Sequence, residues 1–232
     1  MHPILQRMEI GYRIFVVEQN DTAPFNKAKI MNAAFLEAST RRFAGELEEG
    51  VEVKDQQQQQ VKFTCFVFHD VDLLLQNELN DYGCRSSPRY MCPAIDIWGY
   101  TSFSAYSFGG VVGITGKDFR AVNGYSNRYW GWGSEDDDLF WRYHHAGYKI
   151  SRPSMAEGRY TMLKHKPSAR NGKAIELLTK TEKGRSDSRQ DGLSNINYEL
   201  LKIKELKLFT KIIVNAKMTS EEEKLTDAKH SF

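Results

Sequence analysis

The run 61–70 (VKFTCFVFHD) constrains the fold of this chain more than any other segment, because it is nearly continuously apolar. Such runs are typical of strands buried on both faces of a parallel sheet. A β-branched and aromatic run at 12–19 predicts an earlier strand, and an apolar helical face at 27–38 predicts a helix between the two strands. The order strand, helix, strand predicts a doubly wound α/β fold, in which ligands bind at the carboxyl ends of the strands.

The rest of the chain continues this pattern as one domain. A length of 232 residues suits a single large domain, and a hydrophobic content of 41% is enough for a buried core. We therefore expect one domain over 1–216. The further expected segments are a helix end at 1–9, a charged, glutamine-rich surface insertion at about 40–60, a strand at 108–115, a helix at 136–146, a strand around 209–214 and a polar, frayed tail at 217–232.

Charge and hydropathy exclude some classes of partner. The 32 basic and 30 acidic residues leave a formal net charge of +2, which gives no electrostatic footprint for nucleic acid or for an anionic membrane. No apolar run reaches the length of about 18 residues that a spanning helix needs. The first residues also lack the basic and apolar regions of a signal peptide.

Two aspartates, Asp70 and Asp72, leave the buried strand on the same side of an extended backbone. A divalent metal that carries a diphosphate needs hard oxygen ligands at such a strand end. A solvated turn after a strand would have the same sequence, so the two aspartates alone do not decide between these interpretations.

The run 130–138 (WGWGSEDDD) places four acidic residues at the start of a predicted helix. Acidic residues there are favoured by the helix macrodipole, so a purely structural role is a strong alternative. The preceding Trp-Gly-Trp-Gly is harder to explain as capping, because glycine allows close backbone approach and an indole suits the C–H face of a sugar. One of the carboxylates could take a proton from a hydroxyl nucleophile.

Two other features stay open from the residues alone. Met162 and His165 are three apart, but a lone Met is usually core filler and a lone His is usually hydrogen-bonded. Gly109 and Gly110 mark either a place where a ligand lies against the backbone or a bulge.

Together, several strings closely resemble the β-1,4-galactosyltransferase family. They run in family order over roughly 2–215, and the WGWG-x-EDDD string is highly specific. The matching strings are HPILQR, FNKAK, FTCFVFHDVDL, PRY, SFGGVVGIT, VNGYSNRYWGWGSEDDD, SRP, GRYTMLKH and DGLSNINYELL.

The resemblance implies a nucleotide-diphospho-sugar transferase fold of the GT-A type, Rossmann-like, with a mixed sheet flanked by helices. It also implies roles for single residues. Asp72, Met162 and His165 match the family's ligands for a metal ion, usually manganese. Asp136 matches the catalytic base. Glu135, expected to be catalytic with it, matches a residue around donor and acceptor. Cys65 and Cys84 match a disulfide. The positions that match donor or acceptor contacts are Phe25, Lys27, Asp70, Val71, Asp72, Ser107, Gly110 and Trp132.

The chain also departs from the family pattern. Lys27 stands where an Arg is usual, so the planar guanidinium group of that arginine is missing near the nucleotide. Ser107 stands where the family usually has a Tyr, and a smaller residue there admits the N-acetyl group of the donor. The family's domain begins before residue 1, with a strand that holds the uridine. We therefore expect a member shortened at its N-terminus, weakly active or inactive as written.

The leading hypothesis is inverting transfer of galactose or N-acetylgalactosamine from a UDP-sugar to a terminal sugar, expected to be GlcNAc, with formation of a β-1,4 linkage. The acceptor would be a glycoprotein or glycolipid in the Golgi lumen, and the full-length form a type II membrane protein. The alternative is a non-catalytic or fragmentary member that binds a glycan or partner without turnover. A glycosidase could also use paired carboxylates, but it would not need the metal ligands.

Overall fold

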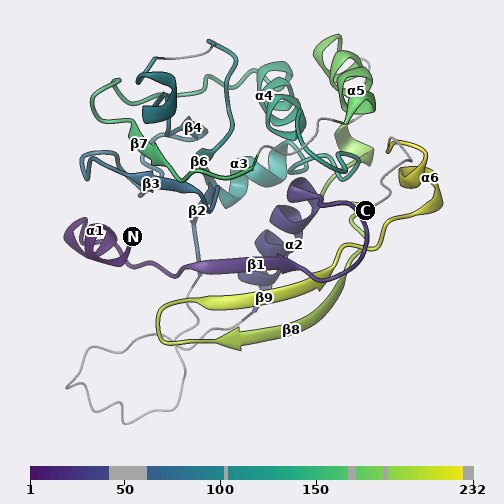
Figure 1. The fold of residues 1–232 in the computed structure, drawn as a ribbon, viewed down its shortest axis with the longest axis horizontal. Coiled ribbons are helices and arrows are strands. Elements are labelled where there is room, and N and C mark those ends of the chain that lie inside the picture. Colours follow the sequence, from purple (N-terminus) through teal and green to yellow (C-terminus); the bar gives the residue numbers. More distant parts are fainter. Residues whose placement is uncertain (42–61, 102–103, 167–170, 185–187, 227–232) are drawn as a thin grey trace.

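The computed structural model of the chain describes residues 1–41, 62–101, 104–166, 171–184 and 188–226. Three small sheets and the helices around them make up this part (Figure 1). The predicted insertion lies, from residue 42 on, outside the described residues. The elements are α1 (His2–Arg7), β1 (Phe15–Gln19), α2 (Lys27–Thr40), β2 (Cys65–His69), β3 (Leu73–Leu75), β4 (Arg89–Tyr90), β5 (Ala94–Ile95), η1 (Asp96–Trp98), β6 (Val111–Thr115), α3 (Gly116–Ala121), α4 (Glu135–His145), β7 (Arg159–Met162), α5 (Gly172–Glu182), η2 (Ser188–Gln190), β8 (Glu199–Glu205), β9 (Thr210–Asn215) and α6 (Ser220–Glu223).

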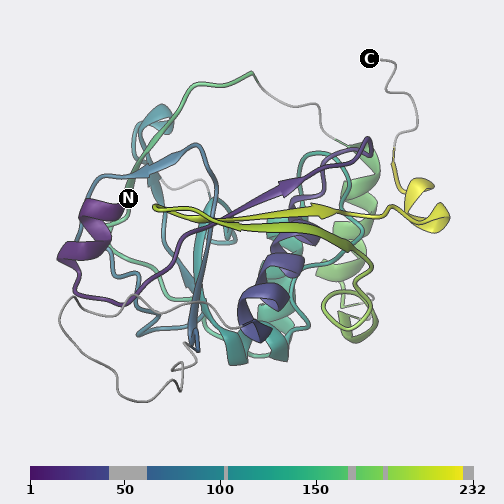
Figure 2. The same cartoon turned by 90° about the horizontal axis from the view of Figure 1, so that it is seen from below.

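The first sheet joins the two ends of the chain. β1 pairs in parallel with β9, with Phe15 opposite Thr210, and β9 pairs antiparallel with β8. Figure 2 shows the three strands running side by side across the molecule. The strands expected near 12–19 and 209–214 are therefore confirmed, whereas β8 was not predicted. Its residues (ELLKIKE) are mostly exposed or half-buried, as suits a strand at the edge of a sheet.

The other two sheets have the orders β2–β6–β4 and β3–β7–β5. The expectation of a parallel sheet around the apolar run is wrong, because β2 pairs antiparallel with β6, and Phe68 is its one buried residue. Parallel pairing does occur between β5 and β7 as well as between β1 and β9. Parallel and antiparallel strands together give the predicted mixed α/β architecture.

Helix α2 packs on two parts of the core at once. Its Ile30 and Ala33 lie against Ile212 and Val214 of β9, while Phe35 belongs to the main cluster that also contains residues of β2, β6 and α4. The side chain of Asn26 caps the helix by accepting a hydrogen bond from the backbone N–H of Lys29. Because both sides of α2 are buried, the packing of the helix fixes the position of Lys27, its first residue.

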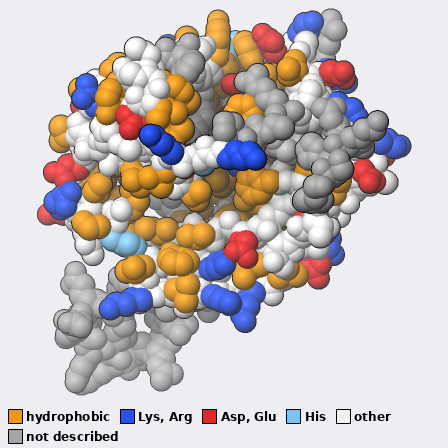
Figure 3. All heavy atoms as spheres, viewed as in Figure 1, with side chains coloured by type: hydrophobic (Ala, Val, Ile, Leu, Met, Phe, Trp, Pro, Cys, Tyr) orange, Lys and Arg blue, Asp and Glu red, His pale blue; other side chains and the backbone are white. Residues whose placement is uncertain are grey.

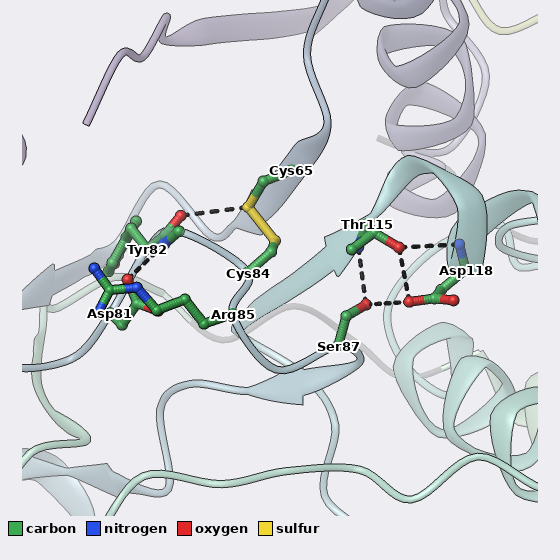
Figure 4. Close-up of a disulfide and its surroundings, with 9 residues drawn as sticks. Cys65, Asp81, Tyr82, Cys84, Arg85, Ser87, Thr115 and Asp118 are labelled. Atoms are coloured by element: carbon green, nitrogen blue, oxygen red, sulfur yellow. Dashed lines mark hydrogen bonds and ion pairs between the residues drawn. A yellow bond between two sulfur atoms is a disulfide. The ribbon is translucent and has the colours of Figure 1, made fainter.

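A disulfide joins Cys65, at the start of β2, to Cys84, and Figure 4 shows the carbonyl of Tyr82 beside the Cys65 sulfur. The predicted pairing is confirmed. Cys92 is a buried free thiol, and burial raises its pKa to about 12. The disulfide ties the strand that leads to Asp70 and Asp72 to the segment that follows them.

The end of the described chain is ordered, so the expectation of fraying from Lys217 is wrong for 217–226. Thr219 and Glu222 form a reciprocal capping box at the start of α6. Glu222 also makes a salt bridge with the buried Lys29 of α2. Among all these described helices, none combines the length and the hydropathy that crossing a bilayer requires.

Candidate active site

Helix α4 carries the acidic run of the sequence into the site. Glu135, Asp136, Asp137 and Asp138 form its first turn, and an arginine and two histidines lie in its last turn. This distribution of charge matches the helix macrodipole at both ends. The apolar side predicted for this helix is buried against the core.

Lys27, at the start of α2, meets three carboxylates at once. Its Nζ lies 2.9 Å from Oδ1 of Asp70, 3.4 Å from Oε1 of Glu135 and 3.0 Å from Oδ2 of Asp136. Asp70 leaves the end of β2, while the other two carboxylates come from α4. One ammonium group therefore joins the end of β2 to the start of α4, whose Asp136 is 109 positions from Lys27 in the sequence.

The electrostatics of this cluster increase the basicity of Asp136. Burial raises the pKa of the Asp136 carboxyl well above its ordinary value, and the nearby carboxylates of Glu135 and Asp70 raise it further against the opposing charge of Lys27. Burial by itself lowers the pKa of the Lys27 ammonium, but the three carboxylates outweigh it and hold that pKa well above its ordinary value. The lysine is therefore charged, and Asp136 is a stronger base than an ordinary aspartate.

Two glycines allow the cluster to close. Lys27, Asp70, Gly110 and Asp136 line one small cavity, together with the buried Tyr125 and three apolar side chains. A Cβ on Gly109 would lie 2.5 Å from Oδ2 of Asp136, so a side chain there would collide with the carboxylate. Gly110 has a φ of +79°, which favours glycine, and its backbone carbonyl accepts a hydrogen bond from the N–H of Asp70. Gly109 thus leaves room for the Asp136 carboxylate, and Gly110 supplies a backbone acceptor for Asp70.

Asp72 and His165 come together on the neighbouring sheet. Nε2 of His165 lies 3.0 Å from Oδ2 of Asp72, and the backbone N–H of Leu163 donates to the carbonyl of Asp72 over 2.7 Å. Met162 is opposite Leu73 in the pairing of β3 with β7, so it is one residue from Asp72 across the ladder. Among the described residues, no group of three or more His, Cys, Asp and Glu side chains could hold a metal ion. A third protein ligand would therefore have to be of another kind, and the thioether of Met162 fits that requirement.

The remaining predicted contacts include three exposed apolar side chains. Phe25, Val71 and Trp132 expose 54%, 89% and 50% of their surfaces, so each offers an apolar surface to a ligand. The backbone N–H of Gly131 donates to the carbonyl of Phe25 over 2.7 Å, which brings the phenylalanine and the 130–132 turn together. Glu135 is buried beside Lys27.

Ser107 lies in a segment held by Arg152, whose guanidinium donates to the carbonyls of Ala105 and Ser107 over 2.6 and 2.8 Å. Its neighbour Tyr106 stacks on Trp141 of α4, with ring centroids 5.6 Å apart and an interplanar angle of 22°. The tyrosine is therefore engaged with the helix face.

The sequence reasoning missed the polar network that holds the loop before α4. Asn32 donates to the carbonyl of Tyr125 and to the side chain of Asn127, and Asp191 accepts from the backbone N–H of Asn127 and from Ser126. All five residues are buried. An asparagine on a helix, and an asparagine and an aspartate in loops, carry no chemical pattern of their own, so only the contacts identify this role.

Comparisons with known proteins agree with this arrangement. A family model described as the N-terminal region of glycosyl transferase group 7 matches residues 1–85, and one described as the N-terminal domain of galactosyltransferase matches 89–166. The chain is 36% identical over 215 residues to human beta-1,4-galactosyltransferase 2, covering 93% of this chain and 53% of that protein. Mouse beta-1,4-galactosyltransferase 1 is also 36% identical, with 93% of this chain and 49% of that protein covered. The chain belongs to the β-1,4-galactosyltransferase family.

Solved structures of the family have the same fold. The catalytic domain of Drosophila beta1,4galactosyltransferase 7 in complex with xylobiose is 25% identical, with a TM-score of 0.76 over 99% of this chain and 90% of that one. A mutant of the same enzyme with manganese, UDP-Gal and xylobiose is 24% identical, with a TM-score of 0.73. The predicted transferase fold is thereby confirmed. This β-1,4-galactosyltransferase family member spans about half the length of the curated relatives it matches.

Proposed function

We propose that this chain forms the catalytic part of a metal-dependent, inverting transferase. It would move galactose or N-acetylgalactosamine from a UDP-sugar to a hydroxyl of a terminal sugar, with GlcNAc as the expected acceptor and a β-1,4 linkage as the product. The observation that carries this proposal is Asp136, a largely buried carboxylate with a raised pKa beside a charged lysine. A carboxylate of increased basicity suits removal of a proton from an attacking hydroxyl.

The residues around Asp136 divide the work of binding. Lys27 offers a positive charge to the phosphates of the donor and also orients Asp136, with which it shares a 3.0 Å contact. Glu135 and Asp70 offer carboxylate oxygens to sugar hydroxyls, and the half-exposed Trp132 offers its indole face to a sugar ring. On release of the proton to Asp136, the acceptor oxygen attacks the anomeric carbon and the nucleoside diphosphate leaves.

The metal would be held by Asp72, His165 and Met162, with manganese as the expected ion. When bound, it supplies positive charge that stabilises the departing diphosphate. We expect manganese to bind the full-length protein in isothermal titration and to lose most of its affinity in Asp72→Ala with His165→Ala. Unchanged manganese affinity in that double variant would rule out this ligand set.

The function itself is tested with the full-length protein, UDP-galactose, UDP-N-acetylgalactosamine, manganese and a panel of terminal-sugar acceptors that includes GlcNAc and xylobiose. We expect turnover, and we expect Asp136→Asn to abolish it while UDP still binds in titration. Binding of UDP and of an acceptor without any turnover would favour the alternative, a non-catalytic member of the family.

For the donor, we propose that N-acetylgalactosamine is accepted at least as well as galactose, because Ser107 replaces a bulkier tyrosine. The contact of Tyr106 with Trp141 supports this assignment, since Tyr106 packs on α4. Removing a steric clash broadens the choice of donor rather than reversing it. Ser107→Tyr should raise the kcat/KM ratio of UDP-galactose over UDP-N-acetylgalactosamine, and Tyr106→Phe should leave it unchanged. An unaltered ratio in Ser107→Tyr would show that this position does not control the donor.

The Golgi lumen remains a proposal that follows from the family. The Cys65–Cys84 disulfide supports it, since disulfides persist in the oxidising secretory pathway. Fluorescence microscopy of the tagged full-length protein, with a Golgi marker as reference, tests it.

A further inference from the structure

The 130–132 turn presents Trp132 to the site, and hydrogen bonds from a residue outside the turn hold its backbone. Trp130 is buried, and Gly131 has a φ of +82°, so the turn needs the glycine. Asn171, the N-cap residue of α5, holds both ends of the turn: its side-chain amide donates to the carbonyl of Trp130 over 2.9 Å, and its backbone N–H donates to the carbonyl of Trp132 over 3.4 Å. The orientation of Trp132 therefore depends on where Asn171 is.

The C-terminal segment 217–226 contacts the same residues. The side-chain amide of Asn171 also donates to the carbonyl of Leu225 over 3.0 Å, so one side chain bridges the turn and the segment. Lys173 donates to the carbonyls of Lys224 and Thr226 over 2.9 and 2.8 Å. Leu225 packs against a small apolar cluster that includes Tyr129, the residue before the turn.

A buried ion pair anchors this segment under the turn. The Lys29 side chain is 1% exposed, and its Nζ lies 3.0 and 3.1 Å from the two carboxylate oxygens of Glu222. The same ammonium lies 5.0 Å from the centroid of the Trp130 ring and donates to the carbonyl of Lys217 over 3.1 Å. A buried charge that loses its partner is strongly destabilising, so Lys29 requires Glu222.

We propose that the segment 217–226 positions the 130–132 turn for acceptor binding, with Lys29 and Glu222 as positioning residues. The matches to the family models end at residue 166, before α6 begins. The proposal rests on the proposed function only in assigning Trp132 to the acceptor. The geometric part, that the pair holds the turn, stands independently of any turnover.

Hydrogen exchange tests the geometric part directly. The amide of Gly131, which donates to the carbonyl of Phe25, reports opening of the turn. In the full-length protein, Glu222→Gln keeps the capping side chain of α6 but removes its charge. We expect the protection factor of Gly131 to fall on the order of tenfold or more, because the buried ammonium is left unmatched. The amide of Ile212 in β9 should keep its protection, which excludes global unfolding.

Two matched variants separate the ion pair from the helix. Glu221→Gln removes an exposed carboxylate of the same helix and should leave the protection of Gly131 unchanged. Lys29→Met combined with Glu222→Gln leaves no unmatched charge and should recover most of the protection lost in the single variant. Equal protection of Gly131 in the wild type and in Glu222→Gln would overturn the proposal, as would a failure of the double variant to recover protection.

Kinetics test the functional part. With GlcNAc or xylobiose as acceptor, Glu222→Gln should raise the acceptor KM several-fold while the KM for UDP-galactose stays unchanged. A protein that turns over with unaltered acceptor KM would overturn the role of the segment, even if Gly131 loses protection. Absence of turnover in the wild type would instead refute the proposed function, and the exchange result would still decide whether the segment holds the turn.

Discussion

Removing the side chain of Arg142 should be among the most destabilising single changes in this protein. Arg142 lies in α4, with 1% of its side chain exposed, and its guanidinium contacts Asp138 at 2.6 Å and Asp191 at 3.2 Å. It also donates to the carbonyls of Gly124 and Asp191. One side chain therefore joins α4 to the polar network that holds the preceding loop.

The size of the effect follows from what the substitution leaves behind. In Arg142→Met the methionine keeps most of the buried apolar contact, but the carboxylates of Asp138 and Asp191 lose their counter-charge. Breaking one buried ion pair costs about 3–5 kcal/mol. Both carboxylates retain other donors, namely Tyr129 and Thr181 for Asp138, and Ser126 and a backbone N–H for Asp191. We therefore expect a loss within that range, against a total free energy of unfolding of about 5–15 kcal/mol.

The measurement is urea unfolding of the wild type and of Arg142→Met, followed by circular dichroism. Arg7→Met is the matched control, because Arg7 pairs with Glu78 while 58% and 50% of their side chains are exposed. Exposed pairs contribute about 0–1 kcal/mol. If Arg142→Met lost no more free energy than Arg7→Met, the buried cluster would not be the device that holds α4 in place.

Three further outcomes follow from the site. Asp136→Asn should abolish turnover and yet increase the free energy of unfolding at neutral pH, because burial raises the pKa of Asp136 in the folded protein. This gain in stability should disappear when the pH falls below the pKa of the unfolded chain, which is about 4, and pH-dependent thermal unfolding would show it. Gly109→Ala should lower kcat about 100-fold with little change in UDP affinity, since its Cβ would displace the Asp136 carboxylate, and an unchanged kcat would contradict this. Cys65→Ser with Cys84→Ser should lose about 3 kcal/mol in urea unfolding, since the bond closes a short loop, and no loss would show that the link contributes nothing to stability.

Local signals in the sequence predicted the elements that carry the site. The apolar run that became β2 and the apolar face of α4 are compositional and periodic patterns that arise from burial. The acidic start of α4 is a pattern that arises from the helix macrodipole. The parallel pairing expected for β2 was wrong, because a continuous apolar run reports burial but not which strand lies beside it. The ordered α6 was overlooked although Thr219 and Glu222 show the spacing of a capping box.

Functional roles were predicted less completely than elements. The roles of Asp136 and of Asp72, Met162 and His165 came from the family resemblance, since lone methionines and histidines carry no signal of their own. The position of Lys27 among three carboxylates depends on contacts between α2, β2 and α4. Asp191 and Asn127 were likewise ordinary polar residues until the fold brought them together. Such contacts are long-range, and no local pattern encodes them.

The pairing of β1 with β9 has a consequence for how the chain acquires its fold. The two strands are separated by about the whole described sequence, with Phe15 opposite Thr210. On the ribosome, β1 emerges before β9 and has to wait until the sequence between them has been synthesised before this partner exists. Closing so long a loop is slow, and during that time an unpaired, apolar strand edge is open to association with other chains. β1 therefore has no partner in this sheet until β9 has been made, and loss of β9 would leave it without one.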